Sequence, residues 1–222
     1  MKKPTLNFGQ FKQYDKLFLN AEQGIDVENV SSVAFDGETL YIAQADGLLE
    51  YNQGKVKKLS AKVNKLFSRN GTLYAASGNT LNELKNGKLK KIAQFDSAVL
   101  DISVALDGSF WLVTEKTLYR KDGNEFTSIV GVPEDIICLA AYDNFAKYQE
   151  TVYIGCAEEG LMSMKGKRRH WAELVPDITG VLSTKINCMA IDSLGHLWAG
   201  SDEGLNIYDD KNYWFNGNDF YS

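Results

Sequence analysis

Reactive and membrane-spanning features are scarce in this sequence. Its 222 residues include three cysteines and two histidines, and no apolar run approaches the roughly 18 residues that a membrane helix needs. The cysteines, Cys138, Cys156 and Cys188, are an odd number without the spacing of a zinc site. They therefore predict neither a disulfide framework nor a metal centre.

Proline and net positive charge are also lacking, and each absence excludes a class of protein. The three prolines are outnumbered by 19 glycines, so the turns must be built mainly from glycine, asparagine and aspartate. A formal net charge of −5 provides no general attraction to nucleic acid or to an anionic membrane. With 44% hydrophobic and 24% charged residues, the composition is globular and excludes a disordered chain, a collagen or a coiled coil.

The amino-terminal sequence gives information about where in the cell the protein is located. It reads MKKPTLNFGQ, which has the positive charges of a signal peptide without an apolar segment behind them. A cytoplasmic location is expected if the chain is complete. A periplasmic or extracellular location is expected if the chain is part of a sensor whose signal or anchor lies elsewhere.

What the sequence does contain is a repeat. Each unit has an apolar strand, a turn, a second strand led by an aromatic residue, and a leucine seven or eight residues after that aromatic residue. The aromatic residues are Tyr41, Tyr74, Trp111, Tyr153 and Trp198, and the leucines are Leu48, Leu81, Leu118, Leu161 and Leu205. This interval holds while the spacing between units drifts, which indicates a structural repeat. We expect the five aromatic residues to pack between neighbouring units.

The repeat has the dimensions of a propeller blade. Each unit of about 40 residues ends in a fourth short strand after a polar hairpin. We therefore predict an all-β fold, a β-propeller of four-stranded blades, with five blades and almost no helix. The chain, 1–222, is expected to be one domain with repeats at about 30–60, 63–95, 99–130, 136–174 and 186–217.

Residues 1–29 are predicted to form a closing strand and a linker. The segment 10–18 resembles a fourth strand, and a strand of this kind can cover the exposed edge of a last blade. Two arrangements remain open: a closed five-bladed ring, or a piece of a longer array that continues beyond Ser222. We favour the closed ring, because the second arrangement would leave large open blade faces.

The last unit resembles a known family. Its segment 191–208, IDSLGHLWAGSDEGLNIY, is similar to the two-component regulator propeller repeat, in which an Asp-x-x-Gly turn precedes a Leu-Trp step and a Gly-Leu step. Gly155 and Gly200 keep the glycine of the second strand, whereas Thr80 and Thr117 replace the glycine of the Gly-Leu step. The resemblance covers roughly residues 10–217. It implies a bacterial extracytoplasmic sensor domain that takes part in signal transduction and is associated with polysaccharide sensing.

No catalytic residue, metal ligand or cofactor is predicted. His170 and His196 lie far apart in any propeller, so a histidine dyad is not expected. Asp36, Asp107 and Asp192 recur at the same turn, where we expect them to cap their own backbone, and Asp143 is expected to match them.

Two of the thiols fall near the predicted channel. Cys188 aligns with Ser32, Lys65 and Ser103 on the first strand of the unit, and Cys138 lies one residue away from this alignment. Small residues suit the narrow inner ring, so we expect both to be buried thiols. The basic run at 165–170 is expected to be a solvated hairpin, and no nucleic-acid partner is predicted.

The loops between the second and third strands are the candidate ligand site. They carry varied polar residues and are expected to gather at one mouth of the channel. The predicted lining is Asp46, Asn79, Glu115, Glu158, Glu159 and Asp202. The alternative is an acidic, solvated rim that binds nothing.

The function favoured by the sequence is a non-catalytic ligand-binding or sensory propeller. Its partner would be an oligosaccharide or another small ligand at the channel mouth, or another protein. Two alternatives remain: a propeller enzyme of the lyase, lactonase or glycosidase type that uses rim carboxylates, and a structural protein-interaction platform.

Overall fold

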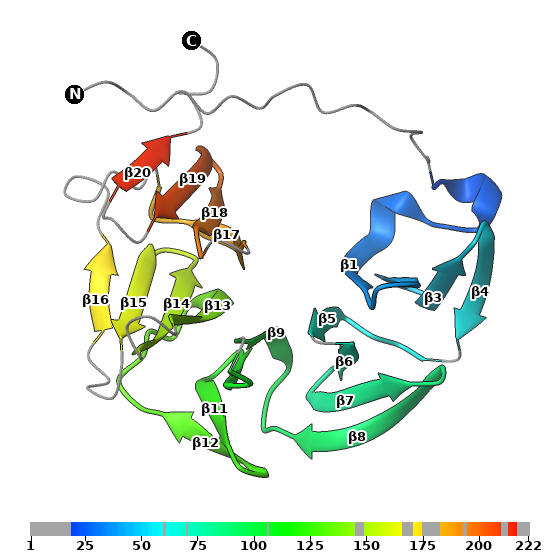
Figure 1. Cartoon of the computed structure of the whole chain (residues 1–222), viewed down its shortest axis with the longest axis horizontal. Helices are drawn as coiled ribbons and strands as arrows, with labels where there is room; N and C mark the ends of the chain where they lie inside the picture. The colour runs from blue at the N-terminus through cyan, green and yellow to red at the C-terminus, as the bar shows by residue number, and fades with distance from the viewer. Residues whose placement is uncertain are drawn as a thin grey trace.

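The structure is a computed structural model that describes residues 19–59, 61–69, 71–105, 107–144, 149–165, 171–174, 183–192, 195–209 and 213–216. Within them, twenty strands form five four-stranded antiparallel sheets arranged around a central channel (Figure 1). The two helical segments described are single 3-10 turns, Ala21–Gln23 and Val27–Asn29. The predicted all-β propeller with five blades and almost no helix is confirmed. The predicted closing strand at 10–18 lies outside the described residues.

Each blade consists of four consecutive strands that run from the channel outward (Figure 1). Blade 1 contains β1 (Val30–Phe35), β2 (Leu40–Gln44), β3 (Gly47–Asn52) and β4 (Lys55–Leu59). Blade 2 contains β5 (Lys65–Arg69), β6 (Thr72–Ser77), β7 (Thr80–Lys85) and β8 (Lys88–Gln94). Blade 3 contains β9 (Val99–Val104), β10 (Phe110–Thr114), β11 (Leu118–Asp122) and β12 (Glu125–Ile129). Blade 4 contains β13 (Ile136–Asn144), β14 (Gln149–Cys156), β15 (Leu161–Lys165) and β16 (Trp171–Leu174), and blade 5 contains β17 (Ile186–Ile191), β18 (Leu197–Ser201), β19 (Gly204–Asp209) and β20 (Tyr213–Asn216).

Turn chemistry fixes where these strands end. In the outer hairpins of blades 1 and 2, Gln53 and Asn86 have positive φ angles of 46° and 52°, and a glycine follows each of them. Two consecutive residues with positive φ give the tight hairpin whose twist matches the flanking strands.

An aspartate holds the turn between the first and second strands in three blades. The Oδ1 of Asp36 accepts two backbone N–H groups at 3.1 and 2.9 Å, that of Asp107 accepts one at 2.7 Å, and that of Asp192 accepts one at 2.9 Å. The predicted turn-capping role of these three residues is confirmed. The side chain of Asp143 lies outside the described part.

Apolar contacts join each blade to the next. The repeated leucine is fully buried in the first four blades, at Leu48, Leu81, Leu118 and Leu161. Trp111 is 1% exposed and packs with Ile136 and Leu139 of blade 4, and Tyr74 meets Phe110 of blade 3 edge-on with ring centroids 4.9 Å apart. Tyr41 and Tyr153 likewise pack against the following blade. The repeated aromatic residue thus lies between blades in the first four repeats, as predicted.

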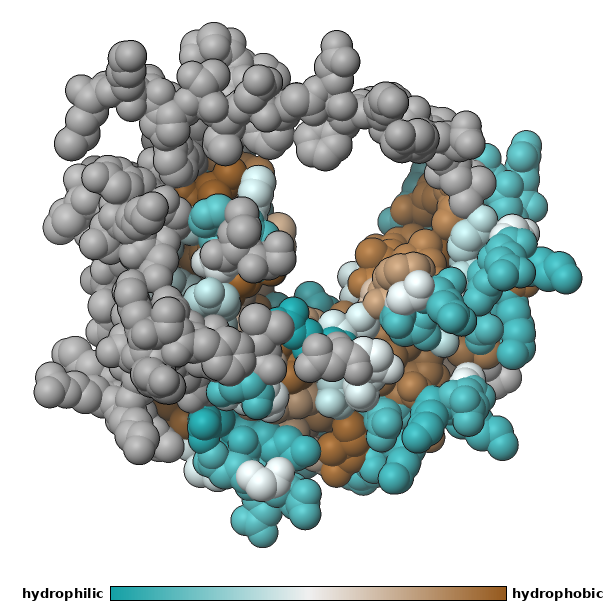
Figure 2. Space-filling view, viewed as in Figure 1, coloured by the Kyte–Doolittle hydropathy of each residue, from teal (hydrophilic) through white to brown (hydrophobic). Residues whose placement is uncertain are grey.

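Blade 5 and blade 1 leave an opening between them, so the described residues do not form the closed ring that we favoured (Figures 1 and 2). The inner strands β1, β5, β9, β13 and β17 pack in sequence, but no comparable packing joins β17 to β1 in this part of the chain. On blade 5, Leu205 is 38% exposed although its four equivalents are fully buried. On blade 1, Val33 is 57% exposed, whereas the equivalent Leu66 of blade 2 is 3% exposed. In the described part of the chain, both flanks of the opening are therefore blade faces without a neighbouring blade.

Trp198 shows the effect of this opening. It occupies the same second-strand position as the other four aromatic residues, but it is only partly buried, and no blade in the described part follows blade 5. Its Nε1 donates a hydrogen bond to Asp192 at 3.1 Å. The expectation that Trp198 packs between two blades is wrong for the described residues.

Candidate functional site

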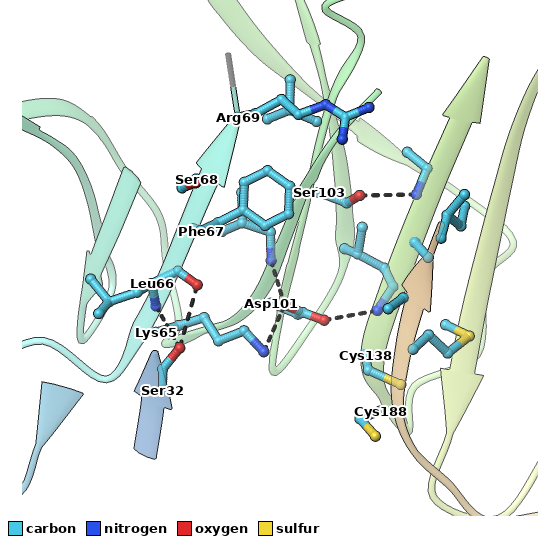
Figure 3. A pocket seen from close by; sticks show the side chains of 18 of the residues that line it. Ser32, Lys65, Leu66, Phe67, Ser68, Arg69, Asp101, Ser103, Cys138 and Cys188 are labelled. Atoms are coloured by element: carbon cyan, nitrogen blue, oxygen red, sulfur yellow. Dashed lines mark hydrogen bonds and ion pairs between the residues drawn. The ribbon is translucent and has the colours of Figure 1, made fainter. Parts of the chain in front are cut away.

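The inner strands enclose a cavity of about 630 Å³ at the centre of the propeller (Figure 3). All five inner strands, β1, β5, β9, β13 and β17, contribute to its lining. A volume of this size suits a small ligand, and only the channel receives residues from every blade. We therefore take the channel as the candidate site.

One position of the repeat contributes a residue from each of the five blades to the same level of the channel wall. The residues at this position are paired with the second-strand residue that lies two after the aromatic anchor. They are Ser32, Lys65, Asp101, Cys138 and Cys188, and all five line the cavity. The sequence alignment placed Ser103 in this set and set Cys138 one residue apart; the strand register corrects both assignments.

Two glycines make room for the sulfur atoms at this level. A Cβ on Gly155 would lie 2.6 Å from the Sγ of Cys138, and a Cβ on Gly200 would lie 2.9 Å from the Sγ of Cys188. Real Cβ atoms do not approach this closely, because tightly packed interiors tolerate little added volume. In both blades, the glycine shared with the two-component regulator propeller repeat thus lies against the sulfur of a cysteine.

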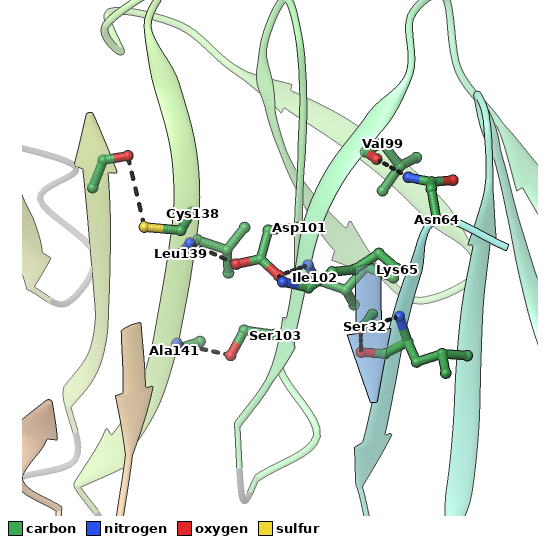
Figure 4. Close-up of polar contacts among 12 residues, drawn as sticks. Ser32, Asn64, Lys65, Val99, Asp101, Ile102, Ser103, Cys138, Leu139 and Ala141 are labelled. Atoms are coloured by element: carbon green, nitrogen blue, oxygen red, sulfur yellow. Dashed lines mark hydrogen bonds and ion pairs between the residues drawn. The ribbon is translucent and has the colours of Figure 1, made fainter. Parts of the chain in front are cut away.

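Side chains of β1, β9 and β13 reach the backbone of the next inner strand (Figure 4). The Oγ of Ser32 accepts the N–H of Leu66 at 2.9 Å, and the Oγ of Ser103 accepts the N–H of Ala141 at 3.0 Å. The Sγ of Cys138 lies 3.6 Å from the carbonyl oxygen of Ile186. These contacts tie adjacent blades together at the channel wall, where neighbouring inner strands do not pair as a sheet.

A charged pair crosses from blade 2 to blade 3. The Nζ of Lys65 lies 2.9 Å from Oδ1 of Asp101, whose side chain is 8% exposed. The same carboxylate accepts the N–H of Ile102 at 2.8 Å and the N–H of Leu139 of blade 4 at 3.1 Å (Figures 3 and 4). Because the buried charge has three partners, its desolvation is compensated and it holds three inner strands in place.

The buried thiols are not activated. Burial, with the carboxylate of Asp101 nearby, raises the pKa of Cys138 far above its ordinary value. Burial, followed by the charge of Asp135, raises the pKa of Cys156 to about 12. Both remain protonated near neutral pH and lack the thiolate that a nucleophilic cysteine requires. Cys188 is exposed in the channel, which corrects the expectation that it is buried.

The charged residues that line the cavity are Lys65, Arg69, Asp101 and Asp192. Asp192 is fully engaged: its Oδ2 lies 2.8 Å from Nδ1 of His196 and also accepts the indole N–H of Trp198. Arg69 differs from the other three, since its Nε is buried and has no hydrogen-bond partner within the described residues.

The six residues predicted from the sequence lie outside this lining. The loops that carry them do lie at one end, because the end of each second strand pairs with the start of the first strand of its blade. At this end Glu115 donates its N–H to the carbonyl of Ala98 at 3.0 Å, and the side chain of Asn79 donates to the carbonyl of Phe95 at 2.8 Å. The N–H groups of Glu158 and Glu159 both reach the carboxylate of Asp135.

Two of the predicted carboxylates are engaged locally. Asp46 forms an ion pair with Lys58 and also accepts the side-chain amide of Gln44, and these hydrogen bonds lower its pKa. Asp202 pairs with Lys185 at 2.8 Å and with Asn187 at 2.6 Å, which lowers its pKa in the same way. Neither residue contacts another member of the predicted set in these bonds. A ligand role for the six residues stays a prediction.

Sequence reasoning missed the Lys65–Asp101 pair and Arg69. A signal was present, because these three residues are charged while most of the first-strand residues around them are apolar or small. Within the described residues, no group of three or more His, Cys, Asp or Glu side chains is arranged to hold a metal ion. The described part also contains no helix that is long and apolar enough to cross a membrane.

Comparisons with known proteins bear on the fold. No protein-family model matches the chain, and no curated protein matches it. The extracellular domain of a putative hybrid two-component system from B. thetaiotaomicron is 16% identical with a TM-score of 0.66, over 90% of this chain and 31% of that one. What they share is the propeller fold.

Two further structures show the range of proteins with this fold. The extracellular domain of a putative one-component system from B. thetaiotaomicron is 20% identical with a TM-score of 0.62, over 84% of this chain and 27% of that one. Virginiamycin B lyase from Staphylococcus aureus is 12% identical with a TM-score of 0.64, over 84% of this chain and 69% of that one. The chain therefore spans about a third or less of the two sensor domains.

Proposed function

We propose that the chain is a non-catalytic, ligand-binding propeller of an extracytoplasmic sensor, and that the ligand binds in the central channel. The proposal rests on the roles of the side chains that line the channel, which connect inner strands or are chemically unreactive. Ser32, Asp101 and Ser103 bridge adjacent inner strands, and the thiol of Cys138 is protonated. These contacts fix the shape of the channel wall, which suits ligand binding better than catalysis.

The likeness to extracellular sensor domains supports the sensory part of this proposal. Fold alone does not give function, so the ligand class follows from the channel rather than from these neighbours. A cavity of about 630 Å³ with a mixed polar and apolar lining fits a small molecule such as a short oligosaccharide.

An enzyme is the second candidate, because a lyase propeller has the same fold. Acid–base catalysis needs a carboxylate or histidine that is free to take a proton from the substrate. The channel carboxylates, Asp101 and Asp192, are instead engaged in hydrogen bonds to the protein. The binding function is therefore preferred.

A plug in the channel tests the proposal. Ala190 is exposed and lines the cavity, so Ala190→Trp should fill part of it without disturbing a packed interface. Val130→Trp adds the same side chain at an exposed site away from the cavity and serves as the matched control. Calorimetry with a panel of short oligosaccharides should show binding that is lost in Ala190→Trp and kept in Val130→Trp.

The same panel separates the channel from the predicted rim. The triple variant Asp46→Ala, Glu158→Ala, Asp202→Ala changes rim residues only, and it should bind as the wild type does if the ligand lies in the channel. Loss of binding in the triple variant with unchanged binding in Ala190→Trp would move the site to the rim. Turnover of any bound sugar would favour the enzyme.

A further inference from the structure

Arg69 is the charged residue of the channel that lacks an oppositely charged partner within the described residues. Lys65 and Asp101 neutralise each other, and Asp192 is held by His196 and Trp198. No carboxylate of the described residues pairs with the guanidinium of Arg69, which extends from the end of β5 across the cavity (Figure 3). Arg69 is therefore the channel cation with which no carboxylate of the described residues forms an ion pair.

Burial of the Nε of Arg69 costs free energy as long as no hydrogen-bond acceptor is available. The Nε of Arg69 is inaccessible to solvent and has no hydrogen-bond partner in the described part of the chain. A buried donor left without an acceptor loses its bond to water and gains nothing in return. Native proteins keep few such groups, and a functional role or a bound ion is among the explanations for those that persist.

The surroundings of Arg69 add an apolar side to the site. Phe67 lies two residues earlier on β5, and Tyr142 occupies the position on β13 that is equivalent to Arg69; both line the cavity. The hydroxyl of Tyr142 lies where a Cβ on Gly195 would fall, so this ring is held by close packing against blade 5. A cation with one aromatic ring on its own strand and a second ring in the same cavity suits a ligand with an anionic group on a ring-shaped or apolar body.

We propose that Arg69 binds an oxyanion group of a small ligand in the channel. A guanidinium presents a planar fork of N–H donors that matches a carboxylate or a sulfate, and Arg69 lines the cavity. The ligand class is thus a small molecule that carries a carboxylate or a sulfate ester, such as an acidic sugar. This inference rests on the proposed function, in which the channel is the binding site.

Matched ligand pairs and matched variants test the assignment. The probes are glucuronate against glucose for the carboxylate, glucose 6-sulfate for the sulfate ester, and inorganic sulfate for the bare anion. Calorimetry or NMR titration should show that the wild type binds at least one acidic sugar more tightly than glucose. Arg69→Gln should weaken that binding tenfold or more and leave the affinity for glucose unchanged, and Arg69→Lys should give an intermediate loss.

Two controls separate binding from folding. Lys88→Gln removes one positive charge from the exposed end of the outer strand β8 and should leave binding unchanged. The melting temperature of Arg69→Gln should equal or exceed that of the wild type, because the substitution removes an unsatisfied buried donor.

Each outcome decides between the two proposals. Full retention of acidic-sugar binding in Arg69→Gln would overturn the oxyanion site. Equal affinity for glucose, glucuronate and glucose 6-sulfate in the wild type would also overturn it, while the binding channel would stand if Ala190→Trp abolished binding of all three. Binding of inorganic sulfate without binding of either acidic sugar would overturn the assigned ligand class, because the site would then hold only a free anion. If no probe and no oligosaccharide bound the wild type, both proposals would fail.

Discussion

Single residues at the channel wall show how tightly this propeller is packed. Gly155 and Gly200 occupy the same position of the repeat, yet their surroundings differ. A Cβ on Gly155 would meet the Sγ of Cys138 at 2.6 Å and the Cγ2 of Ile186 at 2.7 Å, both buried. A Cβ on Gly200 would meet only the Sγ of Cys188 under 3 Å, and that side chain is exposed and can move.

Gly155→Ala should therefore be much more damaging than Gly200→Ala. The first substitution forces buried groups apart and should lower the free energy of unfolding by about 1–3 kcal/mol. The second should cost less than about 1 kcal/mol, because a surface side chain can adjust. Urea denaturation of the two variants measures the difference, and equal losses would contradict the strand register that pairs Gly155 with Cys138.

The two tryptophans of the repeat form a second matched pair. Trp111 is enclosed between blades 3 and 4, so Trp111→Ala should cost about 3–5 kcal/mol by leaving a large cavity. Trp198 is partly exposed beside the opening, so Trp198→Ala should cost less than about 2 kcal/mol, including its hydrogen bond to Asp192. Chemical denaturation measures both values. A larger loss for Trp198 would indicate that its blade face is covered in solution.

At the scale of the element, the strand interval was predictable and the inner register was not. The second and third strands are joined by a two-residue hairpin in blades 1, 2 and 5, so the aromatic-to-leucine interval could be counted along the sequence. The turn between the first and second strands varies: Arg69 pairs with Thr72, whereas Val104 pairs with Phe110. Counting residues back from the aromatic anchor across this turn therefore assigned Ser103, instead of Asp101, to the shared position of the channel wall.

This difference explains why the fold was predictable and the candidate site was not. The channel wall consists of first-strand residues, and their level depends on the variable turn. The charge of Arg69 was visible in the sequence, but its lack of an ion-pair partner was not, because that depends on the pairing of Lys65 with Asp101 and of Asp192 with His196. The first pair joins strands of two blades, and the second lies within the turn between β17 and β18.

The bridging of inner strands by Asp101 gives a prediction at the same scale. Asp101→Ala removes acceptors from the buried N–H groups of Ile102 and Leu139 and leaves Lys65 unpaired. Breaking a buried pair from one side costs about 3–5 kcal/mol, and the partial exposure of Lys65 should place this variant near the lower value.

An exposed ion pair of the same kind provides the control for that prediction. Asp122 pairs with Arg120 on the outer part of blade 3, where both side chains are accessible. Asp122→Ala should lower the free energy of unfolding by less than about 1 kcal/mol. Similar losses for the two variants in urea denaturation would show that the channel pair contributes no more than a surface pair.

At the scale of the whole molecule, the five blades form an open row with two ends within the described residues. Blades 2, 3 and 4 each have a neighbour on both faces, whereas blades 1 and 5 each have one within the described residues. The side-chain bridges follow the same order, from Ser32 of blade 1 to Cys138 of blade 4. The exposed faces at Val33 and Leu205 mark the two ends of the row.

An open row has different cooperativity from a ring, because its units are coupled only to nearest neighbours and the end units have half the coupling. Opening of an end blade breaks one interface, whereas opening of a central blade breaks two. Native-state hydrogen exchange should therefore show lower protection for the backbone amides of β2 and β18 than for those of β10. Equal protection in all three strands would mean that the end faces are covered in solution. Unequal protection would make the blades beside the opening the first to separate, so that the channel widens by local unfolding from its ends while the central blades stay folded.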